Sequence, residues 1–170
     1  MDNGKVQAFS ESISAKLPPI RNPTSQLVMS SQHNLFLNHR ILVRTYDIDS
    51  AGHVSNIAYL RWLEDMRLEL FEKYFPLRDF VNAGITPVIA STHIEYKRPI
   101  KLFDRPEGFM WVSEMGRASL IIEAELRVDS LVTTVARHVG VFVMLDTGKP
   151  IRVPEVCRAK FAQGQLSTSI

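Results

Sequence analysis

An apolar stripe along residues 56–75 is the feature that most constrains how this 170-residue chain can fold. Apolar residues recur there at helical spacing, and the stripe is wide enough to predict a helix that is largely buried. Its members are Tyr59, Leu60, Leu63, Met66, Leu70, Phe71 and Tyr74. Because proline cannot continue a helical hydrogen-bond ladder, we expect the helix to end near Phe75 and Pro76.

The segment before this helix holds the residues of greatest chemical interest. Residues 40–47 are rich in bulky apolar side chains and predict a strand. Asp47 and Asp49 are two residues apart, so they would share one side of an extended chain. Small residues, Gly52 among them, then break the strand, and the helix begins near Asn56, whose side chain is a candidate helix cap. A carboxylate beside the unpaired first amides of a helix could hold a base or nucleophile next to an oxyanion.

Four more strands are expected downstream, joined mostly by short turns. They cover residues 86–97, 107–115, 120–128 and 131–145, and an extended segment follows at 150–154. The third has the clearest alternation, with leucine and isoleucine on one side and Glu123, Glu125 and Arg127 on the other, which predicts a half-buried antiparallel strand. The order of elements predicts an α+β fold in which the helix covers one face of an antiparallel sheet. Because the other face would be poorly buried, we expect at least a dimer.

Composition sets the expected boundaries of the domain. Residues 1–38 are polar and serine-rich, contain three prolines and show no sustained apolar period, so we expect a disordered or peripheral tail. An organelle targeting peptide is the alternative for this segment. Residues 39–162 form the expected single domain, and residues 163–170 again have the composition of a tail.

Charge and cysteine content exclude several classes of protein. The chain has 20 basic and 18 acidic residues, a balance that gives no indication of a nucleic-acid partner. Its one cysteine, Cys157, excludes an intramolecular disulfide and favours the cytoplasm. No apolar run approaches the roughly 18 residues of a membrane span. The five histidines are scattered, so we expect neither a metal site nor a cofactor.

The run YDIDSAGHVSNIAYLRWLEDMR resembles the signature of hotdog-fold acyl-CoA thioesterases of the 4-hydroxybenzoyl-CoA thioesterase type. The matching positions are Asp49, Gly52, His53, Val54, Asn56, Tyr59, Glu64 and Arg67, and Ser55 departs from the asparagine of many relatives. The resemblance implies a hotdog fold, in which a curved antiparallel sheet wraps a long central helix. It also implies a homodimer or homotetramer with active sites at the subunit interfaces.

The resemblance further implies roles for individual residues. Asp49 would attack the thioester carbonyl or activate water against it, and the backbone amide of Asn56 would hold the carbonyl oxygen. Coenzyme A would lie across the dimer interface near basic residues, for which Lys97 and Arg98 are our candidates. We also assign His53 and Tyr59 to substrate binding, although a histidine in a turn and a tyrosine on an apolar stripe more often have structural roles.

Other functions stay open at the level of the sequence. An acyl carrier protein thioester could replace acyl-CoA as the substrate, and a non-catalytic acyl-binding protein could use the same fold. A hotdog dehydratase fits less well, because its histidine and acid pair is not found in this helical context. Asp47 and Glu64 are the alternative carboxylates if Asp49 is not catalytic, with a structural role and a solvated ion pair as their simpler interpretations.

Overall fold

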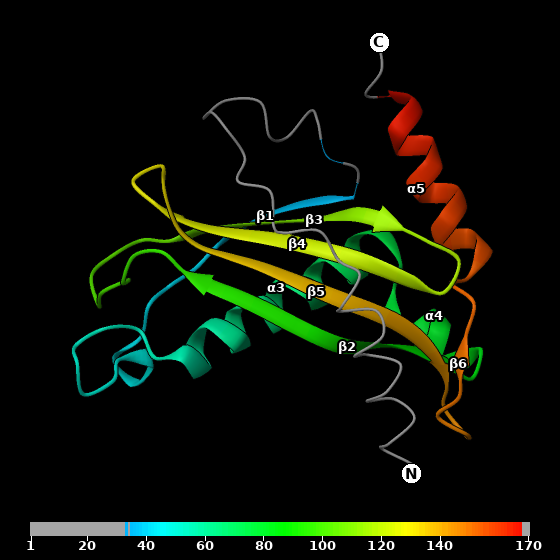
Figure 1. Ribbon diagram of the computed structural model, residues 1–170, viewed down its shortest axis with the longest axis horizontal. Coiled ribbons are helices and arrows are strands. Elements are labelled where there is room, and N and C mark those ends of the chain that lie inside the picture. Colours follow the sequence, from blue (N-terminus) through cyan, green and yellow to red (C-terminus); the bar gives the residue numbers. More distant parts are fainter. Residues whose placement is uncertain (1–32, 34, 168–170) are drawn as a thin grey trace.

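The computed structural model describes residue 33 and residues 35–167 of the chain (Figure 1). In chain order the elements are β1 (Phe36–Arg40), the 3₁₀ helix η1 (Thr45–Asp47), α3 (Asn56–Tyr74), α4 (Leu77–Asn82), β2 (Ile85–Tyr96), β3 (Glu107–Met115), β4 (Ser119–Val128), β5 (Leu131–Met144), β6 (Pro150–Ile151) and α5 (Glu155–Ser167). Most of the expected N-terminal tail, residues 1–32 and 34, lies outside the described residues. Among the helices that are described, none is long and apolar enough to cross a membrane.

The strands form one antiparallel sheet in the order β1-β3-β4-β5-β2, with the short β6 paired to β5. The long helix α3 lies along the concave side of this sheet, and α4 lies beyond the C-terminal end of α3 (Figure 1). The four strands after the helix begin and end within one residue of the expected positions. A long helix wrapped by a curved antiparallel sheet confirms the predicted α+β hotdog fold.

The wide apolar stripe is what buries α3 against the sheet. Most of its members are buried, together with Ala58 and Trp62, whereas Leu60 stays exposed. The helix comes close to the sheet at Gly108 of β3, where an added Cβ would lie 2.6 Å from Sδ of Met66. Glycine therefore allows the helix to pack directly against the start of β3. The helix ends at Tyr74, with Phe75 as its C-cap and Pro76 after it, as predicted.

The opposite face of β4 differs from expectation. Glu123, Glu125 and Arg127 do point away from α3, but Glu125 is only 2% exposed and Arg127 is also buried. Arg127 donates two hydrogen bonds to Oε2 of Glu125, at 2.9 and 2.6 Å, and Arg137 of β5 pairs with Glu123 at 2.6 Å. The prediction of a half-buried strand is therefore wrong: β4 is buried on both faces, and its charges are paired across or along the sheet.

Two further elements lie at other positions in the chain than we expected. The first strand covers Phe36–Arg40 rather than residues 40–47, because its partner β3 begins at Glu107, directly after Pro106, and Arg40 pairs with that first residue. At the other end, α5 extends through Ser167, into the segment expected to be a tail. Its buried Cys157 and Phe161 are four residues apart, a helical spacing that was available in the sequence.

Candidate active site

A tight turn leads into α3. The amide of Asp49 donates to the carbonyl oxygen of His53 at 2.8 Å, and the amide of Gly52 donates to the carbonyl oxygen of Asp49 at 3.0 Å. Ile48 and Val54 form a β-bridge across the base of the turn. Gly52 has a φ of +77°, a left-handed conformation that a residue without a Cβ adopts at little cost. The backbone of this turn fixes where Asp49 lies relative to the start of the helix.

One carboxylate oxygen of Asp49 is engaged within the turn. Oδ1 accepts a hydrogen bond from the amide of Ala51 at 2.8 Å and a longer one from the amide of His53 at 3.4 Å. Such local bonds are typical of an aspartate in a turn. The residue is exposed, and its Oδ2 has no partner among the residues that the structure describes. The carboxylate is therefore oriented through one oxygen while the other is accessible to water or substrate.

The first amides of α3 are free as well. Ser55 is the N-cap, because its carbonyl oxygen and its Oγ accept from the amide of Ala58 at 3.0 and 3.4 Å. The expectation that the Asn56 side chain caps the helix is therefore wrong. Within the described part of the chain, the amides of Asn56 and Ile57 donate to no acceptor. Free amides at a helix N-terminus carry partial positive charge and favour negative charge nearby.

Asp47 has a structural position instead of a place beside Asp49. Because η1 replaces the expected extended chain, the two carboxylates do not share one side of a strand, and that expectation is wrong. Asp47 is 4% exposed, and its Oδ2 accepts from the amide of Arg44 at 2.8 Å. Its carbonyl oxygen accepts from the amide of Ser55 at 2.8 Å. Asp47 thus joins the start of the turn to the helix cap.

His53 and Tyr59, the expected substrate-binding pair, differ in exposure. His53 is half-buried and contributes its amide and carbonyl to the turn around Asp49. Tyr59 is 2% exposed, and its ring centroid lies 5.5 Å from that of Trp62 and 5.0 Å from that of Tyr96. Burial raises the pKa of the Tyr59 hydroxyl. In this chain Tyr59 is a core residue, and of the two only His53 is partly exposed beside Asp49.

The expected phosphate-binding residues lie on the loop after β2, which contacts the turn. The amide of Val54 donates to the carbonyl oxygen of Ile100 in that loop at 2.8 Å. Nζ of Lys97 lies 3.3 Å from a carboxylate oxygen of Glu95. Arg98 is exposed, and its side chain pairs with no acid of the described chain. The structure therefore brings both cations to the end of the molecule that holds Asp49.

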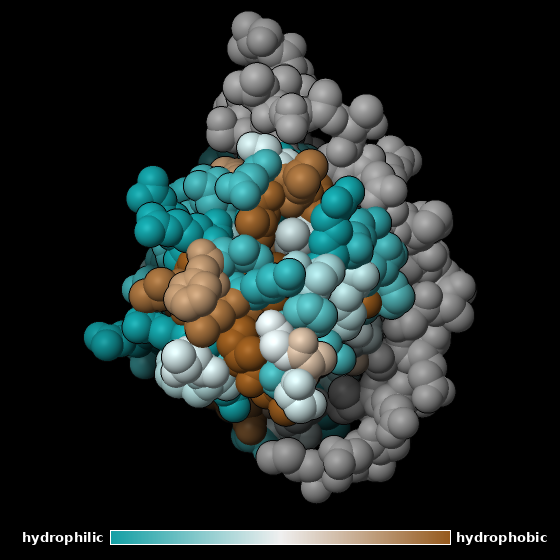
Figure 2. Space-filling model, turned by 90° about the vertical axis from the view of Figure 1, so that its left-hand side faces the viewer, coloured by the Kyte–Doolittle hydropathy of each residue, from teal (hydrophilic) through white to brown (hydrophobic). Residues whose placement is uncertain are grey.

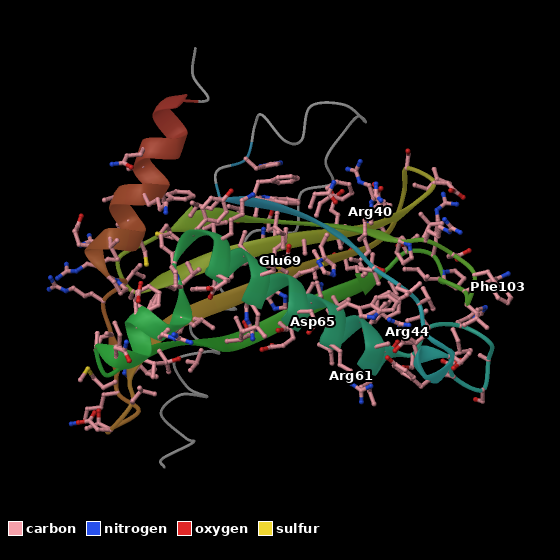
Figure 3. All side chains as sticks on the ribbon, turned by 180° about the vertical axis from the view of Figure 1, so that it is seen from behind. Arg40, Arg44, Arg61, Asp65, Glu69 and Phe103 are labelled. Carbon is pink, nitrogen blue, oxygen red and sulfur yellow. The ribbon has the colours of Figure 1, made fainter. Side chains whose placement is uncertain are left out.

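Apolar side chains are exposed at the same end. Figure 2 shows it as an apolar band bordered by hydrophilic residues. Leu42, Ile57 and Phe103 are among the exposed apolar residues, and Phe103 is 91% exposed. Phe103 and Arg44 project at this end, whereas Arg61, Asp65 and Glu69 follow the outward side of α3 (Figure 3).

The sequence hypothesis missed two further basic residues. Arg40 and Arg105 line an open depression of about 620 Å³ between the end of β1 and the start of β3. They are far apart in sequence and lie near each other because β1 pairs with β3 and the amide of Ile41 donates to the carbonyl oxygen of Pro106 at 3.0 Å. No pattern in the sequence marked these two residues as neighbours.

Similarity to known proteins agrees with this geometry. The fold and the carboxylate beside a helix N-terminus define a hotdog protein of the thioesterase kind. The sequence profile of the thioesterase-like superfamily matches residues 43–161, and the chain belongs to this superfamily. The long-chain acyl-CoA thioesterase FadM of Escherichia coli is 27% identical over 126 residues, which cover 73% of this chain and 96% of FadM.

Solved structures of hotdog thioesterases superpose on most of the chain. A thioesterase from Thermus thermophilus, complexed with coenzyme A and zinc, is 26% identical, with a TM-score of 0.66 and coverage of 79% of this chain and 96% of that one. The DHNA-CoA thioesterase from Staphylococcus aureus is 21% identical, with a TM-score of 0.71 and coverage of 77% and 91%. The second likeness, at lower identity, concerns the fold alone.

Proposed function

We propose that the protein is an acyl-CoA thioesterase, which hydrolyses a thioester to a carboxylic acid and free coenzyme A. One observation carries this proposal. Asp49, an exposed carboxylate with a free oxygen, lies in the tight turn that leads into α3, and the first amides of that helix, those of Asn56 and Ile57, are free. Membership of the thioesterase-like superfamily and the similarity to FadM support the same reaction.

In the proposed reaction, Asp49 either attacks the thioester carbonyl carbon or removes a proton from the water that attacks it. The carbonyl oxygen gains negative charge in the tetrahedral intermediate and accepts a hydrogen bond from the amide of Asn56. One such donor is worth about 3 to 4 kcal/mol of transition-state stabilisation. The leaving group is a thiolate, whose conjugate acid has a pKa near about 8.5, so its departure needs little assistance from an acid. A single carboxylate is therefore sufficient.

Coenzyme A requires cations for its phosphates. Lys97 and Arg98 lie on the loop that contacts the turn, and Arg40 and Arg105 line the nearby depression. Exposed Arg98 has no competing acid in the described chain, which supports a role in phosphate binding. The exposed Phe103 offers an apolar surface beside these cations.

We also propose that two copies of the chain associate through β2. This strand of 12 residues is the last in the sheet order and so forms one edge of the sheet. Most of its residues are half-exposed although they are largely apolar. Apolar side chains that stay half-exposed along an edge strand favour burial against another protein surface. Light scattering after size exclusion would give the mass of a dimer or tetramer, and a monomer would contradict this part of the proposal.

The test of the function is release of free thiol, followed with a chromogenic thiol reagent. Short, long and aromatic acyl-CoAs are compared, together with the same acyl groups on an acyl carrier protein. Asp49→Asn preserves the Oδ1 acceptor of the turn and should lower kcat by about 10² to 10⁴, the range of general-base catalysis. Asp65→Asn, on the outward side of α3, is the matched control and should retain activity.

Each contrary result identifies one alternative. Equal activity of wild type and Asp49→Asn would remove Asp49 from the mechanism and direct attention to Glu64. Activity with the carrier-protein thioesters alone would select the carrier-protein thioesterase. Binding of acyl-CoA without turnover of any substrate would select the non-catalytic acyl-binding protein.

A further inference from the structure

A second site lies farther along α3, at a cleft of about 210 Å³ between the helix and β2. Its lining is apolar apart from an ion pair between Glu64 and Arg67, two residues of α3. The apolar residues come from four elements and include Leu68, Phe71, Pro87, Ile89, Leu120 and Ile122. The shape and lining suit an apolar chain.

His138 of β5 lies beside this cleft, next to two of the residues that line it. In the sheet register it is opposite Ile122 of β4, and Gly140 follows it on the same face of β5; both of these residues line the cleft. His138 is 3% exposed. Its Nδ1 lies 2.8 Å from Oγ1 of Thr92 on β2, but its Nε2 has no hydrogen-bond partner among the described residues. Among the described residues, Nε2 is thus a buried nitrogen without a partner, on a residue that pairs with a strand position lining the cleft.

The imidazole is neutral at neutral pH. Burial, with the nearby cation of Arg67 as a smaller cause, lowers the pKa of His138 to about 4. In a neutral imidazole one nitrogen donates and the other accepts. Because the Thr92 hydroxyl is able to donate to Nδ1 or accept from it, Nε2 can act in either role. A hydroxyl group on a ligand would satisfy both tautomers, and an oxo group would satisfy one.

We propose that Nε2 of His138 binds an oxygen on the acyl group of the substrate, and that the preferred substrates are therefore long-chain acyl thioesters with a hydroxyl or oxo group far from the thioester. This inference rests on the proposed function, since it deepens its substrate class. A polar atom is costly to leave unpaired in an apolar interior, so a ligand oxygen that pairs with it gains selectivity over a plain hydrocarbon chain.

The distance along α3 between Asn56 and the cleft sets the length of the acyl group. Arg67 lies eleven residues beyond Asn56, so the cleft is about 16 Å along the helix axis from the proposed oxyanion site. An acyl group bound at Asn56 and running along α3 would reach His138 only through a long chain. The oxygen that pairs with Nε2 therefore belongs near the far end of the chain rather than beside the thioester.

Steady-state kinetics with a matched pair of substrates tests this proposal. Dodecanoyl-CoA and ω-hydroxydodecanoyl-CoA differ only in the terminal hydroxyl. The wild type should favour the hydroxylated substrate by about tenfold in kcat/KM, the effect of one hydrogen bond. His138→Leu should abolish this preference, so that the two substrates have the same kcat/KM. Thr92→Val keeps the imidazole but removes its partner, and should lose part of the preference.

A control histidine is available on the same sheet. His93 of β2 points away from α3 and is exposed, so His93→Leu should keep the full preference for the hydroxylated substrate. Identical selectivity in wild type and His138→Leu would overturn the proposal and indicate that water or a second copy of the chain satisfies Nε2. Thr92→Val, which differs little in volume from the native residue, repeats the comparison if His138→Leu does not fold.

Calorimetric binding separates this inference from the proposed function. Both ligands are titrated into Asp49→Asn and into the double variant Asp49→Asn with His138→Leu. If Asp49→Asn binds the hydroxylated ligand about tenfold more tightly and the double variant does not, the inference stands even where turnover is absent. Equal affinities in both proteins would reject it whatever the catalytic result.

Discussion

Asp49 and His138 are two functional side chains close to the same helix, α3, but they differ in exposure and in what surrounds them. Asp49 is exposed, and its turn is held by backbone hydrogen bonds between residues that are close in sequence. His138 is buried, and its surroundings come from β2, β4, β5 and α3. A local turn fixes an attacking group while leaving it open to solvent, whereas a buried side chain suits recognition of a part of the substrate that does not react.

The largest expected effect tests whether the turn acts through its backbone. Asn56→Pro removes the amide proposed to bind the oxyanion, and proline is well tolerated at the first position of a helix. Ser55 already has a φ of −68° and a ψ of 150°, which a following proline requires. We expect kcat to fall by about 10² to 10³ with little change in stability.

Asn56→Ala is the matched control for this substitution. It removes the side chain and keeps the amide, so its kcat should stay close to that of the wild type. A proline variant that is folded, as judged by circular dichroism, and fully active would show that the helix amide does not contribute to catalysis.

This contrast also explains how much the sequence predicted. Asp49, Gly52 and Asn56 lie within eight residues, so rules for turns and helix starts were sufficient to bring them together. His138 occurs in the most apolar strand, and its importance depends on the register with Thr92 and Ile122, which no local rule supplies. Burial of the outer face of β4 was missed for the same reason: alternation predicts which residues share a face, but not what covers it.

Acid should destabilise the folded protein because His138 is buried in its neutral form. In the unfolded chain His138 takes up a proton near pH 6.5, whereas in the folded protein its pKa is about 4. The unfolded state therefore binds more protons between these values, and stability falls as the pH is lowered through that window. The loss is about 1.4 kcal/mol per pH unit, or about 3 kcal/mol in total. Urea denaturation from pH 7 to 4 would measure it.

His138→Leu should remove this contribution, so its stability curve should fall less steeply with acid than that of the wild type. The difference between the two curves isolates His138 from the carboxylates that also titrate in this range. Parallel curves would mean that folding does not lower the pKa of His138, and that the imidazole is not buried as the structure describes.

The two aspartates of the turn region allow the comparison to be made within a few residues. Asp47→Ala removes the buried carboxylate that accepts from the amide of Arg44, and should cost about 1 to 3 kcal/mol in the free energy of unfolding. Asp49→Ala removes exposed hydrogen bonds and should cost about 1 kcal/mol or less. Denaturant midpoints measure both. The reverse order of stabilities would mean that Asp49 is the structural residue and would weaken its assignment to catalysis.

The smallest expected effect asks how much catalysis depends on the shape of the turn. Gly52→Ala places a Cβ in open space, so its cost of about 1 kcal/mol comes from the left-handed backbone alone. Gly148→Ala is the control, because Gly148 has a φ of +64° in the turn between β5 and β6 and an added Cβ would also meet open space there. Both variants should lose similar stability, but only Gly52→Ala should lower kcat, because Asp49 is oriented by the turn that this glycine closes. Equal kcat values for the two variants would show that the position of Asp49 does not depend on that turn.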